Sequence, residues 1–116
     1  MKHDVDALKT QVFSIIQEHD SDHPVTSREL EAALHIGGAL VRDIVRELRR
    51  DPDVERRRVG IISHRETKQG GYFIIKTRVE LEDTIQNLKS RALSMHETIS
   101  KMEEVKFSEA GQLSLL

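Results

Sequence analysis

Apolar residues near the start of the chain recur at steps of three and four, which is the spacing of one face of a helix. They are Val5, Leu8, Val12, Ile15 and Ile16. The next stretch, "HDSDHPV" over residues 19–25, is rich in Asp, Ser and Pro. These residues favour turns because their side chains or fixed φ compete with helical geometry. The pattern therefore predicts a first helix over residues 4–19 and a turn after it.

A capping box indicates where a second helix begins. Thr26 precedes Glu29 by three residues, so the hydroxyl of one and the carboxylate of the other can each accept from the partner's backbone amide. Val25 and Leu30 are spaced to form the apolar staple that often accompanies such a box. The run Ile36-Gly37-Gly38 predicts the end of this helix, since glycine adopts a left-handed turn at the lowest cost.

A third helix and a hairpin follow. From about Ala39 to Arg50 one apolar stripe repeats at helical spacing, and Asp51-Pro52-Asp53 ends it. The stripe consists of Val41, Ile44, Val45 and Leu48. Two short runs rich in β-branched and aromatic residues, 59–63 and 71–75, then flank a polar loop that contains glycine. This arrangement predicts a β-hairpin whose loop covers residues 64–70.

A heptad repeat occupies the segment from Thr77 to about Lys106. Its apolar residues alternate at steps of four and three and are Leu81, Ile85, Leu88, Ala92, Met95, Ile99 and Met102. The alternative to a coiled coil is a helix that folds back onto its own domain. A strict 3.5-residue period favours a partner helix, because a straight helix on a globular surface would drift off the stripe. The repeat predicts a homodimer, in parallel or antiparallel order.

Composition places the chain in one fold class. Charged residues make up 33% of the 116 residues and aromatic residues only 3%, which suits helices with solvated faces. The predicted fold is mainly α with a small β-hairpin, divided into a globular domain over 1–76, a dimerisation helix over 77–106 and a flexible tail over 107–116. Without cysteine there is no disulfide, thiolate metal site or cysteine nucleophile. No apolar run is long enough to cross a bilayer, so we expect no membrane association and a cytoplasmic protein.

Charge is segregated along the chain. Residues 37–78 carry 11 basic and 6 acidic side chains, whereas the segments before and after them are both net acidic. A basic block between acidic ones is typical of a surface that meets phosphate.

Two helices joined by a glycine turn and followed by a hairpin resemble a winged helix-turn-helix, a DNA-binding family. The resemblance covers about residues 5–78 and rests on "TSRELEAALHI" as supporting helix, "VRDIVRELRRD" as recognition helix and "GIISHRETKQGGYFI" as wing. A "GGYF" wing followed at once by a long helix is similar to small proteins encoded by phages and prophages.

The resemblance implies which side chains would meet double-stranded DNA. Arg42 and Arg46, one turn apart, are the candidates for base contact, since an arginine offers two parallel donors to guanine. The candidates for phosphate contact are Arg49, Arg50, Arg56, Arg57, Arg58, His64, Arg65 and Lys68. The first turn of the recognition helix lacks base-reading polar groups and Asp43 adjoins Arg42, so we expect weak sequence specificity. The alternative is a solvated face of arginines paired with neighbouring acids.

The last five residues resemble the peptide by which bacterial polymerases and repair proteins attach to the sliding clamp, whose pattern is Gln-Leu-Ser or Asp-Leu-Phe. They are Gln112, Leu113, Ser114, Leu115 and Leu116, the last standing where the pattern has an aromatic residue. The resemblance implies that Gln112 orients the peptide and that the leucines fill an apolar pocket. The alternative is that the leucines pack locally.

These patterns predict a non-enzymatic protein without cofactor or metal. No nucleophile and base pair and no phosphate-binding glycine loop is recognisable, and "EHDSDH" indicates a hydrated loop. The expected function is DNA binding combined with docking on the sliding clamp, in phage replication or repair. The alternatives are a transcriptional regulator whose tail is incidental, and a clamp-binding inhibitor of host replication.

Overall fold

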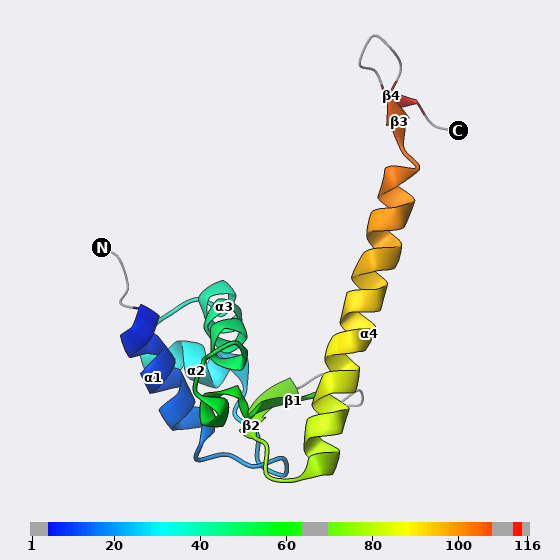
Figure 1. The fold of residues 1–116 in the computed structure, drawn as a ribbon. Coiled ribbons are helices and arrows are strands. Elements are labelled where there is room, and N and C mark those ends of the chain that lie inside the picture. The colour runs from blue at the N-terminus through cyan, green and yellow to red at the C-terminus, as the bar shows by residue number, and fades with distance from the viewer. Residues whose placement is uncertain (1–4, 64–69, 108–112, 115–116) are drawn as a thin grey trace. The chain divides into compact units, whose positions relative to one another are not determined.

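The computed structural model describes residues 5–63, 70–107 and 113–114. In chain order the elements are α1 (Val5–Ile16), α2 (Ser27–Leu34), α3 (Gly38–Arg49), the 3-10 helix η1 (Val54–Arg57), β1 (Val59–Ser63), β2 (Gly70–Ile74), α4 (Arg78–Glu103), β3 (Lys106–Phe107) and β4 (Leu113–Ser114) (Figure 1). The predicted class, mainly α with a small antiparallel hairpin, is confirmed. None of the described helices combines the length and apolar character needed to cross a membrane.

The chain divides into two compact units, Met1–Thr84 and Ile85–Leu116, and the division between them falls inside α4. The first unit has a core between α1, α2, α3 and the hairpin. Its largest fully buried side chains are Val12, Ile16, Leu30, Val41, Ile44, Val45, Leu48 and Val59. Except for Val59 of β1, these are residues that the helical periodicity placed on the inner faces, because each apolar stripe must be removed from water.

The capping box at the start of α2 is confirmed. The Glu29 amide donates to the Thr26 hydroxyl at 3.1 Å, and the Thr26 amide donates to a Glu29 carboxylate oxygen at 3.3 Å. The predicted left-handed glycine is wrong. The residue with positive φ is His35, at 54°, and its amide donates to the Glu31 carbonyl. Because α2 ends at Leu34, three residues before Gly37, that glycine is extended and instead caps the start of α3.

Strand β2 forms backbone hydrogen bonds along both of its edges. On one edge β1 pairs with it antiparallel, from Val59 opposite Ile74 to Ser63 opposite Gly70. On the other edge Val25 and Tyr72 exchange two backbone hydrogen bonds of 2.9 and 2.8 Å, and the Ile74 amide donates to the His19 carbonyl at 3.0 Å. The loop between α1 and α2 therefore fixes the hairpin to the helical core.

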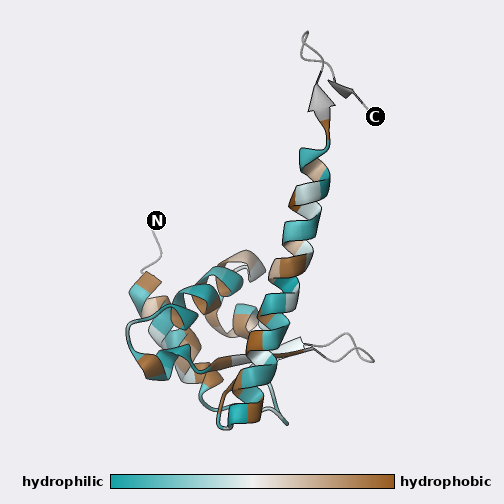
Figure 2. Ribbon diagram, turned by 45° about the vertical axis from the view of Figure 1, so that its right-hand side comes forward, coloured by the Kyte–Doolittle hydropathy of each residue, from teal (hydrophilic) through white to brown (hydrophobic). Residues whose placement is uncertain are grey.

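In the second unit α4 continues to Glu103 and is followed by a short antiparallel pair, Lys106 with Ser114 and Phe107 with Leu113. The sequence predicted a tail without regular structure here. The apolar positions of α4 recur as separate bands in Figure 2. They remain exposed: Ile85 by 41%, Leu88 by 37%, Met95 by 66%, Ile99 by 48% and Met102 by 68%. Nothing in the described part of the chain covers this stripe.

Candidate nucleic-acid interface

Helix α3 presents a row of arginines on its solvent side. The four residues of its buried stripe, Val41, Ile44, Val45 and Leu48, are between 0 and 2% exposed, so the helix is fixed against the core and its opposite face is set by the 3.6-residue period. Arg42 and Arg46 lie four residues apart on that face, Arg50 follows at the same spacing as the C-cap residue just beyond α3, and all three are exposed. Side chains at this spacing are neighbours on a helix surface. The arrangement can place guanidinium donors along a groove or a phosphate backbone.

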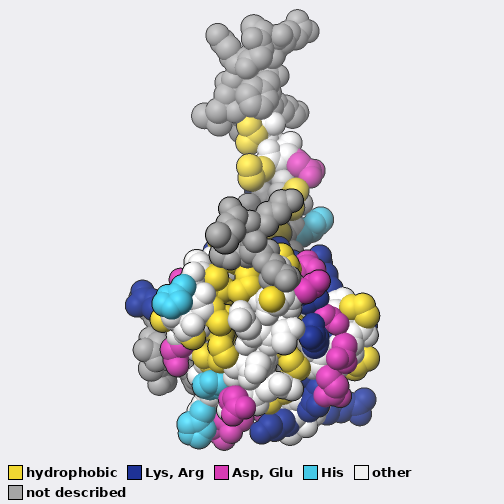
Figure 3. Space-filling model, turned by 90° about the vertical axis from the view of Figure 1, so that its left-hand side faces the viewer, with side chains coloured by type: hydrophobic (Ala, Val, Ile, Leu, Met, Phe, Trp, Pro, Cys, Tyr) yellow, Lys and Arg dark blue, Asp and Glu magenta, His cyan; other side chains and the backbone are white. Residues whose placement is uncertain are grey.

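Acidic residues accompany this row. Arg46 Nη1 lies 3.4 Å from Asp43 Oδ1, and the two side chains are 60% and 64% exposed. An exposed pair of this kind contributes little, so Arg46 can exchange Asp43 for another anion at small cost. Among the described residues no hydrogen bond or ion pair engages the Arg42 guanidinium. On the face drawn in Figure 3, basic side chains lie beside acidic ones and do not form a purely basic surface.

Four of the arginines expected to contact phosphate donate hydrogen bonds within the chain, three to backbone carbonyls and one to a hydroxyl. Arg49 Nε donates to Val59 O at 3.0 Å, which links α3 to β1, and Arg58 Nε donates to Ile75 O at 2.9 Å, which joins the residue before β1 to the residue after β2. Arg57 Nε donates to Asp51 O at 2.6 Å. Arg56 Nη2 donates to the Thr10 hydroxyl at 3.2 Å. This carbonyl- and hydroxyl-binding role was not visible in the sequence, because a run of arginines looks the same whether it faces solvent or its own backbone.

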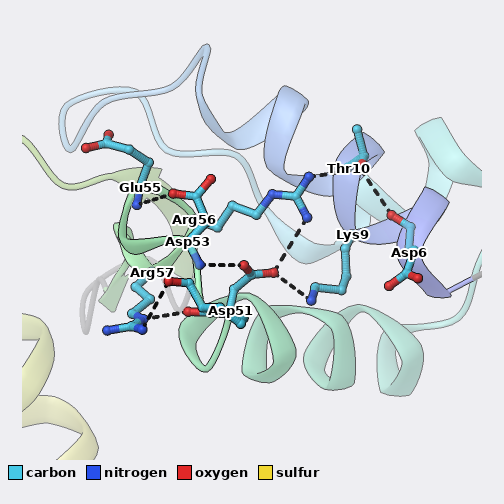
Figure 4. A network of polar contacts seen from close by, with 9 residues as sticks. Asp6, Lys9, Thr10, Asp51, Asp53, Glu55, Arg56 and Arg57 are labelled. Atoms are coloured by element: carbon cyan, nitrogen blue, oxygen red, sulfur yellow. Dashed lines mark hydrogen bonds and ion pairs between the residues drawn. The ribbon is translucent and has the colours of Figure 1, made fainter.

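Asp51, the residue that follows the cap of α3, organises several of these contacts (Figure 4). One carboxylate oxygen lies 2.7 Å from Lys9 Nζ and 3.5 Å from Arg56 Nη1. The other accepts the Asp53 amide at 2.9 Å. The Lys9 hydrogen bond is the main reason why the pKa of Asp51 is below its usual range. From the sequence, Asp51 was expected to end the helix and, in the alternative interpretation, to pair with neighbouring arginines; its contact with Lys9 was not predicted.

The acidic loop between α1 and α2 is stabilised by hydrogen bonds among its own residues. Asp20 Oδ1 accepts the amides of Asp22 and His23 at 3.0 and 2.8 Å, and the hydrogen bond from the His23 amide is the main reason why the Asp20 pKa is lowered. This is the geometry of a turn. No group of three potential metal ligands is found within the described ranges.

Several predicted site residues cannot be placed. His64, Arg65 and Lys68 of the wing loop lie outside the described residues, as do Gln112, Leu115 and Leu116 of the tail. Leu113 and Ser114 form β4. Comparisons of the chain with protein-family models, with curated proteins and with solved structures each found no match.

Proposed function

We propose that this protein binds double-stranded DNA as a non-enzymatic winged-helix protein, with α3 as the recognition helix and the β1–β2 hairpin as the wing. Two observations support the arrangement. The hairpin follows the three helices after the short 3-10 helix η1, and β2 is hydrogen-bonded to the α1–α2 loop through Val25 and His19. A wing attached in this way keeps a fixed position relative to α3, which simultaneous contact with one duplex requires.

The observation that carries the proposal is the row formed by Arg42, Arg46 and Arg50. Arg42 and Arg46 are exposed on a helix whose opposite stripe is buried, and Arg50 is exposed at the C-cap of that helix, so the helix cannot turn them away from a partner. Arginine in the major groove can donate to guanine, and arginine along its edge can neutralise phosphate. Asp43 and Glu47 share this face, and the first turn of α3, Gly38-Ala39-Leu40, brings no polar group that could read a base. Binding therefore depends mainly on contacts with phosphate and discriminates little among base sequences.

We further propose that α4 dimerises the protein through its heptad stripe. Apolar side chains from Ile85 to Met102 are exposed at coiled-coil spacing, and a second copy of the same helix matches their period. A dimer presents two recognition helices, which lets the second contact with DNA become intramolecular.

Docking on the bacterial sliding clamp remains a proposal that rests on the sequence of residues 112–116 alone. The pairing of Leu113–Ser114 with Lys106–Phe107 adds a condition. An extended peptide that binds a clamp groove would have to leave this hairpin first, or bind as one edge of it.

The first experiment is the salt dependence of binding to a duplex of about 20 base pairs, followed by fluorescence anisotropy. With three phosphate contacts, raising the salt from about 50 to 200 mM should weaken binding by about 40-fold. Shuffled duplexes of equal length should bind within a few-fold of one another. Absence of salt-sensitive binding would exclude the DNA-binding function and leave a protein-interaction role for the winged domain.

A further inference from the structure

A hollow of about 430 Å³ opens on the surface of the first unit, where η1, the end of β2 and the first turn of α4 meet. Its apolar lining is Val54, Ile75 and Leu81. The charged side chains that line it are all basic, and Arg57, Lys76 and Arg78 are three of them. All of these residues belong to the same compact unit.

The apolar part of the hollow is accessible. Ile75 is 6% exposed and forms its buried floor, whereas Val54 and Leu81 are 64% and 45% exposed and come from different elements. Single exposed apolar residues are ordinary, but two beside a depression with a buried apolar floor offer a place for one further side chain. The hollow is a surface feature and not an enclosed cavity, which suits a peptide anchor better than an engulfed small molecule.

The cationic rim is only partly neutralised. Arg58, the fourth cation, pairs with Glu55 at 2.7 Å. Arg78 Nε is 3.6 Å from Glu82 in a pair whose side chains are 89% and 66% exposed, which is a weak interaction. Arg57 donates to the carbonyls of Asp51 and Pro52, which orient its guanidinium without cancelling its charge.

The wall contributed by α4 is held in place by its own cap. Glu80 Oε1 accepts the amides of Lys76 and Thr77 at 2.8 and 3.3 Å, and the Glu80 amide donates to the Thr77 hydroxyl at 3.2 Å. The Lys76 amide is the main cause of the lowered pKa of Glu80. The hollow is therefore formed before any partner arrives, which reduces the entropy lost on binding.

We propose that this hollow binds an acidic peptide segment of a protein partner. One apolar side chain of leucine or phenylalanine size enters between Val54, Ile75 and Leu81, and flanking carboxylates lie beside the basic rim. This goes beyond the DNA-binding function. Duplex DNA would satisfy the cations but would leave the apolar side chains without a matching group, because the phosphate backbone offers charge alone.

Fluorescein-labelled nonapeptides test this proposal, with the full-length chain as receptor. Four acidic residues flank a central Leu, Phe or Met on each side. Two control sets carry a central Ser or lysine flanks. We expect binding only where the central residue is apolar and the flanks are acidic. The Val54→Ser variant should bind about tenfold more weakly, the loss expected for a buried valine-sized contact. Leu93→Ser, which removes a 60% exposed apolar side chain of α4, should leave binding unchanged.

Two outcomes would overturn the proposal. One is that no peptide binds, that peptides with a central Ser bind as tightly as those with a central Leu, Phe or Met, or that the Val54→Ser variant binds the peptides as tightly as the parent protein. The other is that duplex DNA displaces the peptide and Arg78→Glu weakens DNA and peptide equally, which assigns the hollow to the nucleic-acid surface. The Arg42→Glu variant separates this test from the DNA proposal, since it should leave peptide binding intact whether or not the chain binds DNA.

Discussion

Lys9 Nζ lies 2.7 Å from Asp51 Oδ2, and this contact joins the middle of α1 to the residue after the cap of α3. The two side chains are only 13% and 10% exposed. Lys9 therefore links the first helix to the end of the proposed recognition helix in a partly dry environment, where breaking a pair costs more than at the open surface.

Replacing Asp51 by Asn should lower stability at neutral pH, and the difference should disappear in acid. The folded-state pKa of Asp51 is depressed, so the stabilisation is present above the ordinary aspartate value of about 3.9 and is lost as the pH falls through the folded value. Thermal melting of both proteins between about pH 7 and pH 2 measures this. A melting-temperature difference that stays constant across that range would contradict the assigned ion pair.

Gly71 should not tolerate a side chain. A Cβ there would lie 2.7 Å from Pro24 Cβ and 3.0 Å from the Val25 carbonyl oxygen, so β2 would be pushed away from the α1–α2 loop. We expect Gly71→Ala to cost about 1–3 kcal/mol, as overpacking does. The control is Gly37→Ala, whose added Cβ meets nothing within 4 Å. Urea unfolding of the two variants compares them, and equal stabilities would argue against the close approach.

We expect the proposed dimer to depend on the heptad stripe of α4 and not on the general hydrophobicity of the helix. Changing both Ile85 and Ile99 to Lys places charge at two core positions of the heptad and should convert the dimer to a monomer in sedimentation experiments. Leu93→Lys introduces the same residue at an exposed position outside the stripe and should leave the mass unchanged. A monomeric parent protein, or a double variant with the parent's mass, would show that the helix does not pair with a second copy.

Deletion of residues 112–116 tests the clamp proposal. Binding of the purified bacterial sliding clamp should be lost, because the deletion removes both the orienting Gln112 and the apolar anchors. The truncated protein should still dimerise and bind duplex DNA, which serves as its folding control. Clamp capture that survives the deletion would exclude this peptide as the attachment point.

The sequence predicted the parts of the fold that depend on short-range patterns. The helical stripes, the Thr26–Glu29 box and the hairpin all follow from spacings of a few residues, and the structure agrees with them to within a few residues at most ends. The left-handed position was missed because His35 adopts it at a helix that ends before Gly37. Whether the left-handed residue is His35 or Gly37 is decided only by the hydrogen bonds in the last turn of α2, which the sequence pattern does not show.

The candidate site was less predictable because it depends on contacts between distant segments. Arg56 reaches Thr10 across 46 residues, and Arg49 reaches the carbonyl of Val59. A count of basic residues along the sequence treats such arginines as available to a partner, so it overestimates the basic surface that can contact phosphate. The hollow near Val54 and Leu81 likewise forms only where η1 and α4 meet. The heptad pattern placed Leu81 in the apolar stripe and gave no sign that it also lines this hollow.

The most direct test compares duplex binding by Arg42→Glu, Arg46→Glu and Lys101→Glu at one moderate salt concentration. All three change the net charge equally, but Lys101 is 81% exposed on α4 and lies outside the proposed interface. The two α3 variants should each lose about 1–3 kcal/mol of binding free energy, and Lys101→Glu should bind like the parent. Equal affinities for all three variants would contradict the proposal that α3 is the recognition helix.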